Sequence, residues 1–160
     1  MTSTKTGSVH IDAEAGKLRI SDVIHVPIKT AWAMLTNRQH IAEWWGDYVS
    51  IEVRPGGTFE ELWSSSDGHP KRAFGTVKTV TAPFELELSW REEDWDFVTR
   101  VCLHLRDLGT STEVSITHAD WPPSPDERTR LILARHYYAW KTCLHRLKYY
   151  ADQHRSKAAG

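Results

Sequence analysis

One long amphipathic stripe in the last third of the chain constrains the fold most. Apolar residues recur there at alternating spacings of four and three: Leu133, Tyr137, Trp140, Leu144, Leu147 and Ala151. This spacing places them along one side of an α-helix. The preceding Ser124-Pro125-Asp126-Glu127 has the pattern of a capping box with proline at the first helical position. We therefore expect a helix from about residue 124 to 150 that covers one face of the segments before it.

The rest of the chain predicts a sheet. Alternating apolar and polar residues indicate strands, and turn-forming or charged segments separate them. The expected strands cover residues 17–26, 48–53, 58–64, 71–80, 84–91, 96–106 and 110–118, and short helices are expected over 28–36 and 38–45. Consecutive strands with short connections pair antiparallel. The sequence thus predicts an α+β fold, in which a curved antiparallel sheet of about seven strands wraps around the C-terminal helix, with two short helices after the first strand.

Length and composition limit the classes of protein. The 160 residues fit one domain, 1–160, with an ordered core at about 9–152 and mobile ends at about 1–8 and 153–160. With 20 basic and 21 acidic residues, nothing attracts the chain broadly to nucleic acid or to an anionic membrane. The sequence shows no signal peptide and no apolar stretch that would span a bilayer, so we expect a cytoplasmic protein. Cys102 and Cys143 are expected to be reduced thiols, and no metal or cofactor site is indicated.

Strand parity identifies which side chains face the helix. In residues 84–90 the even positions are apolar, in 97–105 the odd positions face inward, and in 112–118 the even positions do. The inward set of residues 58–64 is Phe59, Glu61 and Trp63. Glu61 is anomalous, because an unpaired carboxylate on an apolar face has a raised pKa or needs a partner. Either Glu61 lies near a strand end, within reach of water or an arginine, or it has a functional role.

Tryptophan usage suggests a pocket. Three of the 8 tryptophans, Trp63, Trp90 and Trp140, face inward, and Trp45 lies where the second helix turns back toward the sheet. Indole rings suit a pocket for a flat, mostly apolar molecule, but they could also fill the space under the helix. His118 is either a ligand contact or an edge histidine satisfied by backbone or solvent. The expected ligand-binding residues are Trp45, Phe59, Glu61, Trp63, Val77, Trp90, Thr99, Val101, His118, His136, Trp140 and Leu144.

Several short motifs stand in the order and approximate spacing of a known family. They are Val26-Pro27, Ala31 to Thr36, Trp44-Trp45, Arg54 to Phe59, Gly75-Thr76-Val77, Leu88-Ser89-Trp90, Gly109-Thr110, and His136 with Trp140 and Leu144. Over residues 17–150 the chain resembles the activator of heat-shock-protein-90 ATPase type of START-like domain, within the helix-grip superfamily. Ala139 departs from the family pattern, which leads us to expect glycine before the helix tryptophan. Its methyl group would narrow the space beside the helix.

The resemblance implies several functions on one scaffold. We expect non-covalent binding of a small hydrophobic or aromatic molecule, lipid-like or polyketide-like, between the sheet and the helix. One alternative is a co-chaperone-like interaction module that stimulates a heat-shock ATPase in the stress response through surface charges. Another is a cyclase or aromatase in which Glu61 or His118 moves protons, provided that both line the cavity. The sequence contains no recognisable catalytic constellation, so no catalytic residue and no cofactor is assigned.

Charge is distributed unevenly between two segments. The acidic residues are Glu85, Glu87, Glu92, Glu93, Asp94 and Asp96, and the basic ones on the helix are Arg128, Arg130, Arg135, Lys141, Arg146 and Lys148. Solvated surfaces explain both groups. Alternatively, the two segments form a complementary contact in a homodimer or with a chaperone partner.

Overall fold

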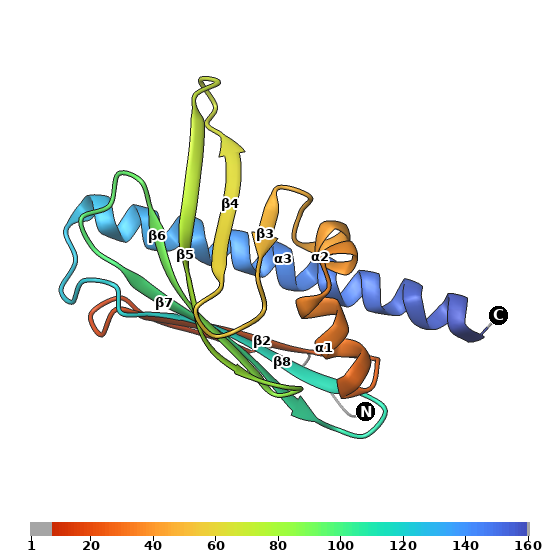
Figure 1. The fold of residues 1–160 in the computed structure, drawn as a ribbon. Helices are drawn as coiled ribbons and strands as arrows, with labels where there is room; N and C mark the ends of the chain where they lie inside the picture. The colour runs from red at the N-terminus through yellow and green to blue at the C-terminus, as the bar shows by residue number, and fades with distance from the viewer. Residues whose placement is uncertain (1–7, 160) are drawn as a thin grey trace.

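An eight-stranded antiparallel sheet and a long C-terminal helix dominate the computed structural model, which describes residues 8–159 (Figure 1). The elements are β1 (Ser8–Asp12), β2 (Lys17–Ile24), α1 (Ile28–Thr36), α2 (Arg38–Trp44), β3 (Val49–Ile51), β4 (Thr58–Ser64), β5 (Pro70–Thr81), β6 (Glu85–Glu92), β7 (Thr99–Asp107), β8 (Thr112–Ala119) and α3 (Glu127–Ala159). The strand order is β1-β2-β8-β7-β6-β5-β4-β3. Figure 1 shows α3 crossing the sheet, with β4 and β5 steep to it and α2 beside its second half. The predicted α+β, helix-grip architecture is confirmed.

The first strand is an addition to the seven that the sequence predicts. β1 pairs antiparallel with β2, from Ser8 opposite Ser21 to Asp12 opposite Lys17. Its apolar side chains, Val9 and Ile11, are exposed, so the strand lacks the buried face that would make its pattern recognisable. Residues 1–7 and 160, part of the ends predicted to be mobile, lie outside the described residues.

Both ends of α3 differ from the prediction. Asp126, rather than Ser124, caps the helix, because its Oδ1 accepts a hydrogen bond of 2.8 Å from the backbone N–H of Thr129. Ser124 has a φ of 47° and belongs to the preceding turn, and the helix begins at Glu127, after Pro125. At the other end the helix continues to Ala159, past the expected end near residue 150. Its last turns continue beyond α2 in Figure 1.

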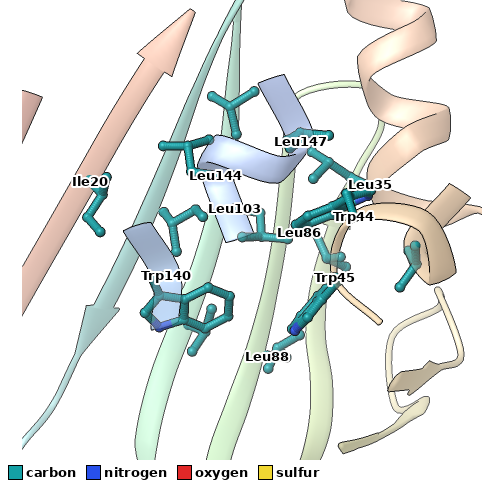
Figure 2. Close-up of a cluster of buried hydrophobic side chains, with 14 of the residues drawn as sticks. Ile20, Leu35, Trp44, Trp45, Leu86, Leu88, Leu103, Trp140, Leu144 and Leu147 are labelled. Carbon is teal, nitrogen blue, oxygen red and sulfur yellow. The ribbon is translucent and has the colours of Figure 1, made fainter. Parts of the chain in front are cut away.

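The core lies between α3 and the sheet. Figure 2 shows Trp140, Leu144 and Leu147 of α3 in the same buried cluster as side chains of β6 and β7, with Trp44 and Trp45 beside them. The other labelled members of this cluster are Ile20, Leu35, Leu86, Leu88 and Leu103. Each fully buried leucine contributes about 1.5 to 3 kcal/mol, so this packing fixes α3 on the sheet. The helix stripe and the strand positions predicted to face inward are buried or half-buried, with one exception: Phe84 precedes β6 and is 47% exposed, so its predicted inward orientation is wrong.

The sheet is irregular where β5 meets β6. The register shifts between Val77 and Thr79, and the backbone N–H of Thr76 donates to the Ser89 hydroxyl at 2.9 Å. Gly75 lies so close to the Ser89 carbonyl that a Cβ atom would collide with it. A bulge of this kind bends a strand and increases its twist. The irregularity lies next to Trp90, which lines the site described below.

Candidate functional site

A cavity of about 650 Å³ lies between α3 and the ends of β4, β5 and β6. Its volume is within the range of small-molecule pockets, roughly 300 to 1,000 Å³. The aromatic wall consists of Trp45, Tyr48, Trp63, Trp90, Trp95 and Trp140. The charged or titratable wall consists of Glu61, Lys71, Glu92, Asp94, Arg128, Arg135, His136 and Cys143. Ser64, Ser65, Ser66, Ile132 and Ala139 complete the lining.

Three tryptophans form the inner end of the cavity. Trp45 and Trp90 are parallel, with ring centroids 6.5 Å apart, and Trp140 meets them edge-on at 5.5 and 5.4 Å. Phe59 packs behind Trp90 at 4.8 Å. The rings therefore fill the space under the middle of α3, and the cavity lies beyond them, toward the beginning of the helix.

His118 is buried behind this aromatic wall and is fully hydrogen-bonded. The indole N–H of Trp140 donates to Nδ1 at 3.1 Å, which makes Nε2 the protonated nitrogen of the neutral ring. Nε2 lies 2.6 Å from the Thr99 hydroxyl, and that hydroxyl donates to the Trp90 carbonyl at 2.8 Å. Burial, with a smaller effect of His136, lowers the pKa of His118 well below its usual value. His118 is therefore held as the neutral tautomer.

His136 joins α3 to the end of β6. Its Nδ1 donates to the Ile132 carbonyl at 2.9 Å, and its Nε2 lies 3.2 Å from a carboxylate oxygen of Glu92. Both ring nitrogens therefore face oxygen atoms, one of a backbone carbonyl and one of a carboxylate. The ring packs against Trp95, Trp121 and His118.

Glu61 lines the same cavity, and its carboxylate has no partner in the part of the chain that the structure describes. No hydrogen bond or ion pair to its carboxylate occurs within residues 8–159, and its strand neighbours are Val49 and Ala73. Desolvation by burial, with repulsion from Glu92, raises the pKa of Glu61 to about 7. Cys143 faces it from α3, and burial together with the Glu61 charge raises the pKa of that thiol to about 12. The raised pKa of Glu61 was predicted from strand parity, and its cause is the predicted desolvation.

The structure separates the predicted binding residues into two sets. Trp45, Glu61, Trp63, Trp90, His136 and Trp140 line the cavity. Phe59, Val77, Thr99, Val101, His118 and Leu144 do not, and their part in ligand binding remains a prediction. Because His118 lies behind the wall, the cavity does not meet the condition set for the cyclase alternative, in which both Glu61 and His118 line it.

Several lining residues were not predicted. On α3 they are Arg128, Ile132, Arg135, Ala139 and Cys143. Helical spacings of three and four place positions 132, 136, 139, 140 and 143 on one side of α3. This second stripe, beside the apolar one, could have been predicted from the sequence. Tyr48, Lys71, Asp94 and Trp95 come from loops and strand ends, which parity does not describe.

The fold and the cavity define a class of protein, the helix-grip domains with an internal site between sheet and helix. Residues 25–152 match the sequence family described as Activator of Hsp90 ATPase homolog 1-like protein. The chain belongs to this family, as its motifs predicted. No curated protein matches the chain in sequence.

Solved structures share the fold at low sequence identity. CalU16 from Micromonospora echinospora is 19% identical with a TM-score of 0.70, over 96% of this chain and 90% of CalU16. Protein Ms6760 from Mycobacterium smegmatis is 15% identical with a TM-score of 0.71, over 88% and 93% of the two chains. DynU16, a protein in the dynemicin biosynthetic locus, is 17% identical with a TM-score of 0.70, over 89% of this chain and 48% of DynU16.

Two further findings concern the described residues. None of the helices within residues 8–159 combines the length and the apolar character needed to cross a membrane. The same residues contain no cluster of three or more histidine, cysteine or acidic side chains that could hold a metal ion.

Proposed function

We propose that this protein binds a small, flat, mainly apolar molecule non-covalently in the cavity between α3 and the ends of β4 to β6. The observation that carries the proposal is the cavity itself, of about 650 Å³ with five tryptophans in its wall. Large aromatic faces provide apolar contact area at a low cost in conformational entropy. The structural similarity to DynU16, a protein in a biosynthetic locus, supports a role with small organic molecules.

A cavity-filling variant tests the proposal. Ala139 lines the cavity from α3, yet its side chain is exposed, so Ala139→Trp would place an indole in the cavity without disturbing the core. Ala134 is also exposed on α3 and lies outside this lining, so Ala134→Trp is the matched control. Flat aromatic compounds, polyphenols and fatty acids would be screened by tryptophan fluorescence and thermal shift.

We expect a compound that binds the parent and Ala134→Trp to bind Ala139→Trp at least about tenfold more weakly, because filled volume excludes the ligand. If no compound changes the fluorescence or melting temperature of the parent, the proposal fails. Equal binding by both variants would place the ligand elsewhere and would also refute it.

A further inference from the structure

We propose that the cavity selects ligands that carry a protonated amine on a flat aromatic body, and that Glu61 is the residue that recognises the amine. The inference rests on the proposed function, since it names the ligand class of the same cavity. It follows from the distribution of charge in the cavity wall.

Among residues 8–159, Glu61 is the acidic group of the wall that has no hydrogen-bond or ion-pair partner. Asp94 pairs with Arg128 at 3.3 Å, and Glu92 pairs with His136 at 3.2 Å. Glu61 lies between Phe59 and Trp63 on β4, at the inner side of the strand, with no ion pair within residues 8–159. A cation is the group that such a carboxylate lacks.

Within residues 8–159, no lysine or arginine pairs with Glu61. Lys71 and Arg135 line the cavity but are exposed side chains at its rim, and Arg128 is paired with Asp94. The charged group that acts on Glu61 is another carboxylate, Glu92, which raises the Glu61 pKa in the same direction as burial does. An arriving ammonium group would be attracted by both carboxylates and would favour the ionised form of Glu61.

The aromatic wall suits the same ligand. Trp45, Trp63 and Trp90 line the cavity together with Glu61, and tryptophan faces attract cations more strongly than other side-chain rings. Trp90 is only 3% exposed, and its indole N–H has no hydrogen-bond partner among the described residues. That N–H is itself enclosed, so the group of the wall that a ligand can satisfy is the Glu61 carboxylate, which has no partner within residues 8–159.

The test compares matched probes on matched variants. The probes are 2-naphthylmethylamine, which is cationic at neutral pH, and 2-naphthylmethanol, its neutral counterpart of similar shape. Binding would be measured by isothermal titration calorimetry at pH 8 with the parent, Glu61→Gln and Glu60→Gln. Glu60 faces the other side of β4 and pairs with Arg72 at 2.6 Å, so its variant removes a carboxylate without changing the cavity.

We expect the parent and Glu60→Gln to bind the amine about tenfold or more tightly than the alcohol, as one charge-assisted hydrogen bond provides. Glu61→Gln should lose this preference and keep its affinity for the alcohol. If the parent binds the alcohol as tightly as the amine, or if Glu61→Gln keeps the preference, the inference is wrong while the proposed function stands. If neither probe binds the parent, the inference fails, and the library screen decides the proposed function separately.

A second measurement follows how the affinity for the two probes depends on pH. Between pH 6 and 8 the affinity of the parent for the amine should rise as Glu61 ionises, while its affinity for the alcohol should not. The other titratable or charged groups of the wall are Tyr48, Lys71, Glu92, Asp94, Arg128, Arg135, His136 and Cys143. Because Glu61→Gln retains all of these, a rise that persists in that variant comes from another group and overturns the assignment.

Discussion

At the scale of single residues, two inward-facing ionisable groups, the buried His118 and the half-buried Glu61, differ in how the fold satisfies them. His118 has a partner for each ring nitrogen, whereas Glu61 has none within residues 8–159. Strand parity placed both residues on the inner face, but it could not distinguish them. The partners of His118 come from β7 and α3, which are distant in sequence, so its role depends on packing that a local pattern does not contain.

Removing His118 should destabilise the protein. His118→Leu leaves the buried N–H of Trp140 without an acceptor, so the free energy of unfolding should fall by about 1 to 3 kcal/mol in urea titrations. In a double-mutant cycle, Trp140→Phe should cost less in the His118→Leu background than in the parent, because the donor is then already unpaired. Strictly additive costs would show that this hydrogen bond contributes nothing.

The effect of His118→Leu on stability should depend on pH. The pKa of His118 is lowered on folding, so the unfolded chain binds more protons and the parent loses stability as the pH falls through the ordinary value of 6.5. The difference in unfolding free energy between the parent and His118→Leu should therefore shrink below pH 6.5. A difference that is constant from pH 8 to 5 would contradict a buried neutral histidine.

The pKa shift of Glu61 should change the pH dependence of stability in the opposite direction. Its folded pKa of about 7 lies above the ordinary 4.5, so the folded state binds the extra proton, and stability is lost as the pH rises from 4.5 through 7. Glu61→Gln should consequently be more stable than the parent at pH 8, by roughly 1 to 3 kcal/mol, and equal to it near pH 4. Urea titrations of both proteins at these pH values measure the difference, with Glu60→Gln as the control. A constant difference would indicate a carboxylate that titrates normally.

At the scale of elements, the sequence predicted the strands that have a buried face and missed the one that does not. The segments Ile28–Thr36 and Thr58–Ser64 have the predicted bounds, because apolar periodicity and turn residues delimit them. β1 was not predicted, because it is an edge strand whose apolar residues face outward. The irregular pairing of β5 and β6 was not predicted either, because a bulge depends on how two strands pair and not on the periodicity of either one.

Gly75 should be essential to this irregular pairing. In Gly75→Ala the new methyl group would meet the Ser89 carbonyl, and backbone cannot move as cheaply as a side chain, so we expect a loss of about 1 to 3 kcal/mol in thermal or urea unfolding. Gly68→Ala is the control, because a Cβ there meets nothing within 4 Å and the variant reports only the backbone cost at its φ of 83°. Equal losses in the two variants would mean that the contact with Ser89 is unimportant.

At the scale of the whole molecule, the cavity arises where charged segments of distant parts of the chain meet. The sequence predicted an acidic strand region and a basic helix, but it could not show that they face each other within one chain. Asp94 lies 3.3 Å from Arg128, and Glu92 lies 3.2 Å from His136. Six of the predicted binding residues line the cavity, from the inner faces of the sheet and α3 and from the end of α2, and the rest of the wall comes from α3, strand ends and loops.

These ion pairs within the chain affect how copies of the protein should associate with one another. Glu87, Glu92, Asp94, Arg128, Arg130 and Lys148 already have ion-pair partners within the chain, so less complementary charge from these segments is left to join two copies. The sedimentation coefficient should therefore be the same at about 20 mM and about 300 mM NaCl, although the screening length shortens several-fold over this range. Arg128→Gln, which frees Asp94 from its partner, serves as the control and should not change the coefficient either. A coefficient of the parent that falls as salt increases would instead show that the acidic strands and the basic helix hold copies together, and it would favour the homodimer alternative over solvated surfaces.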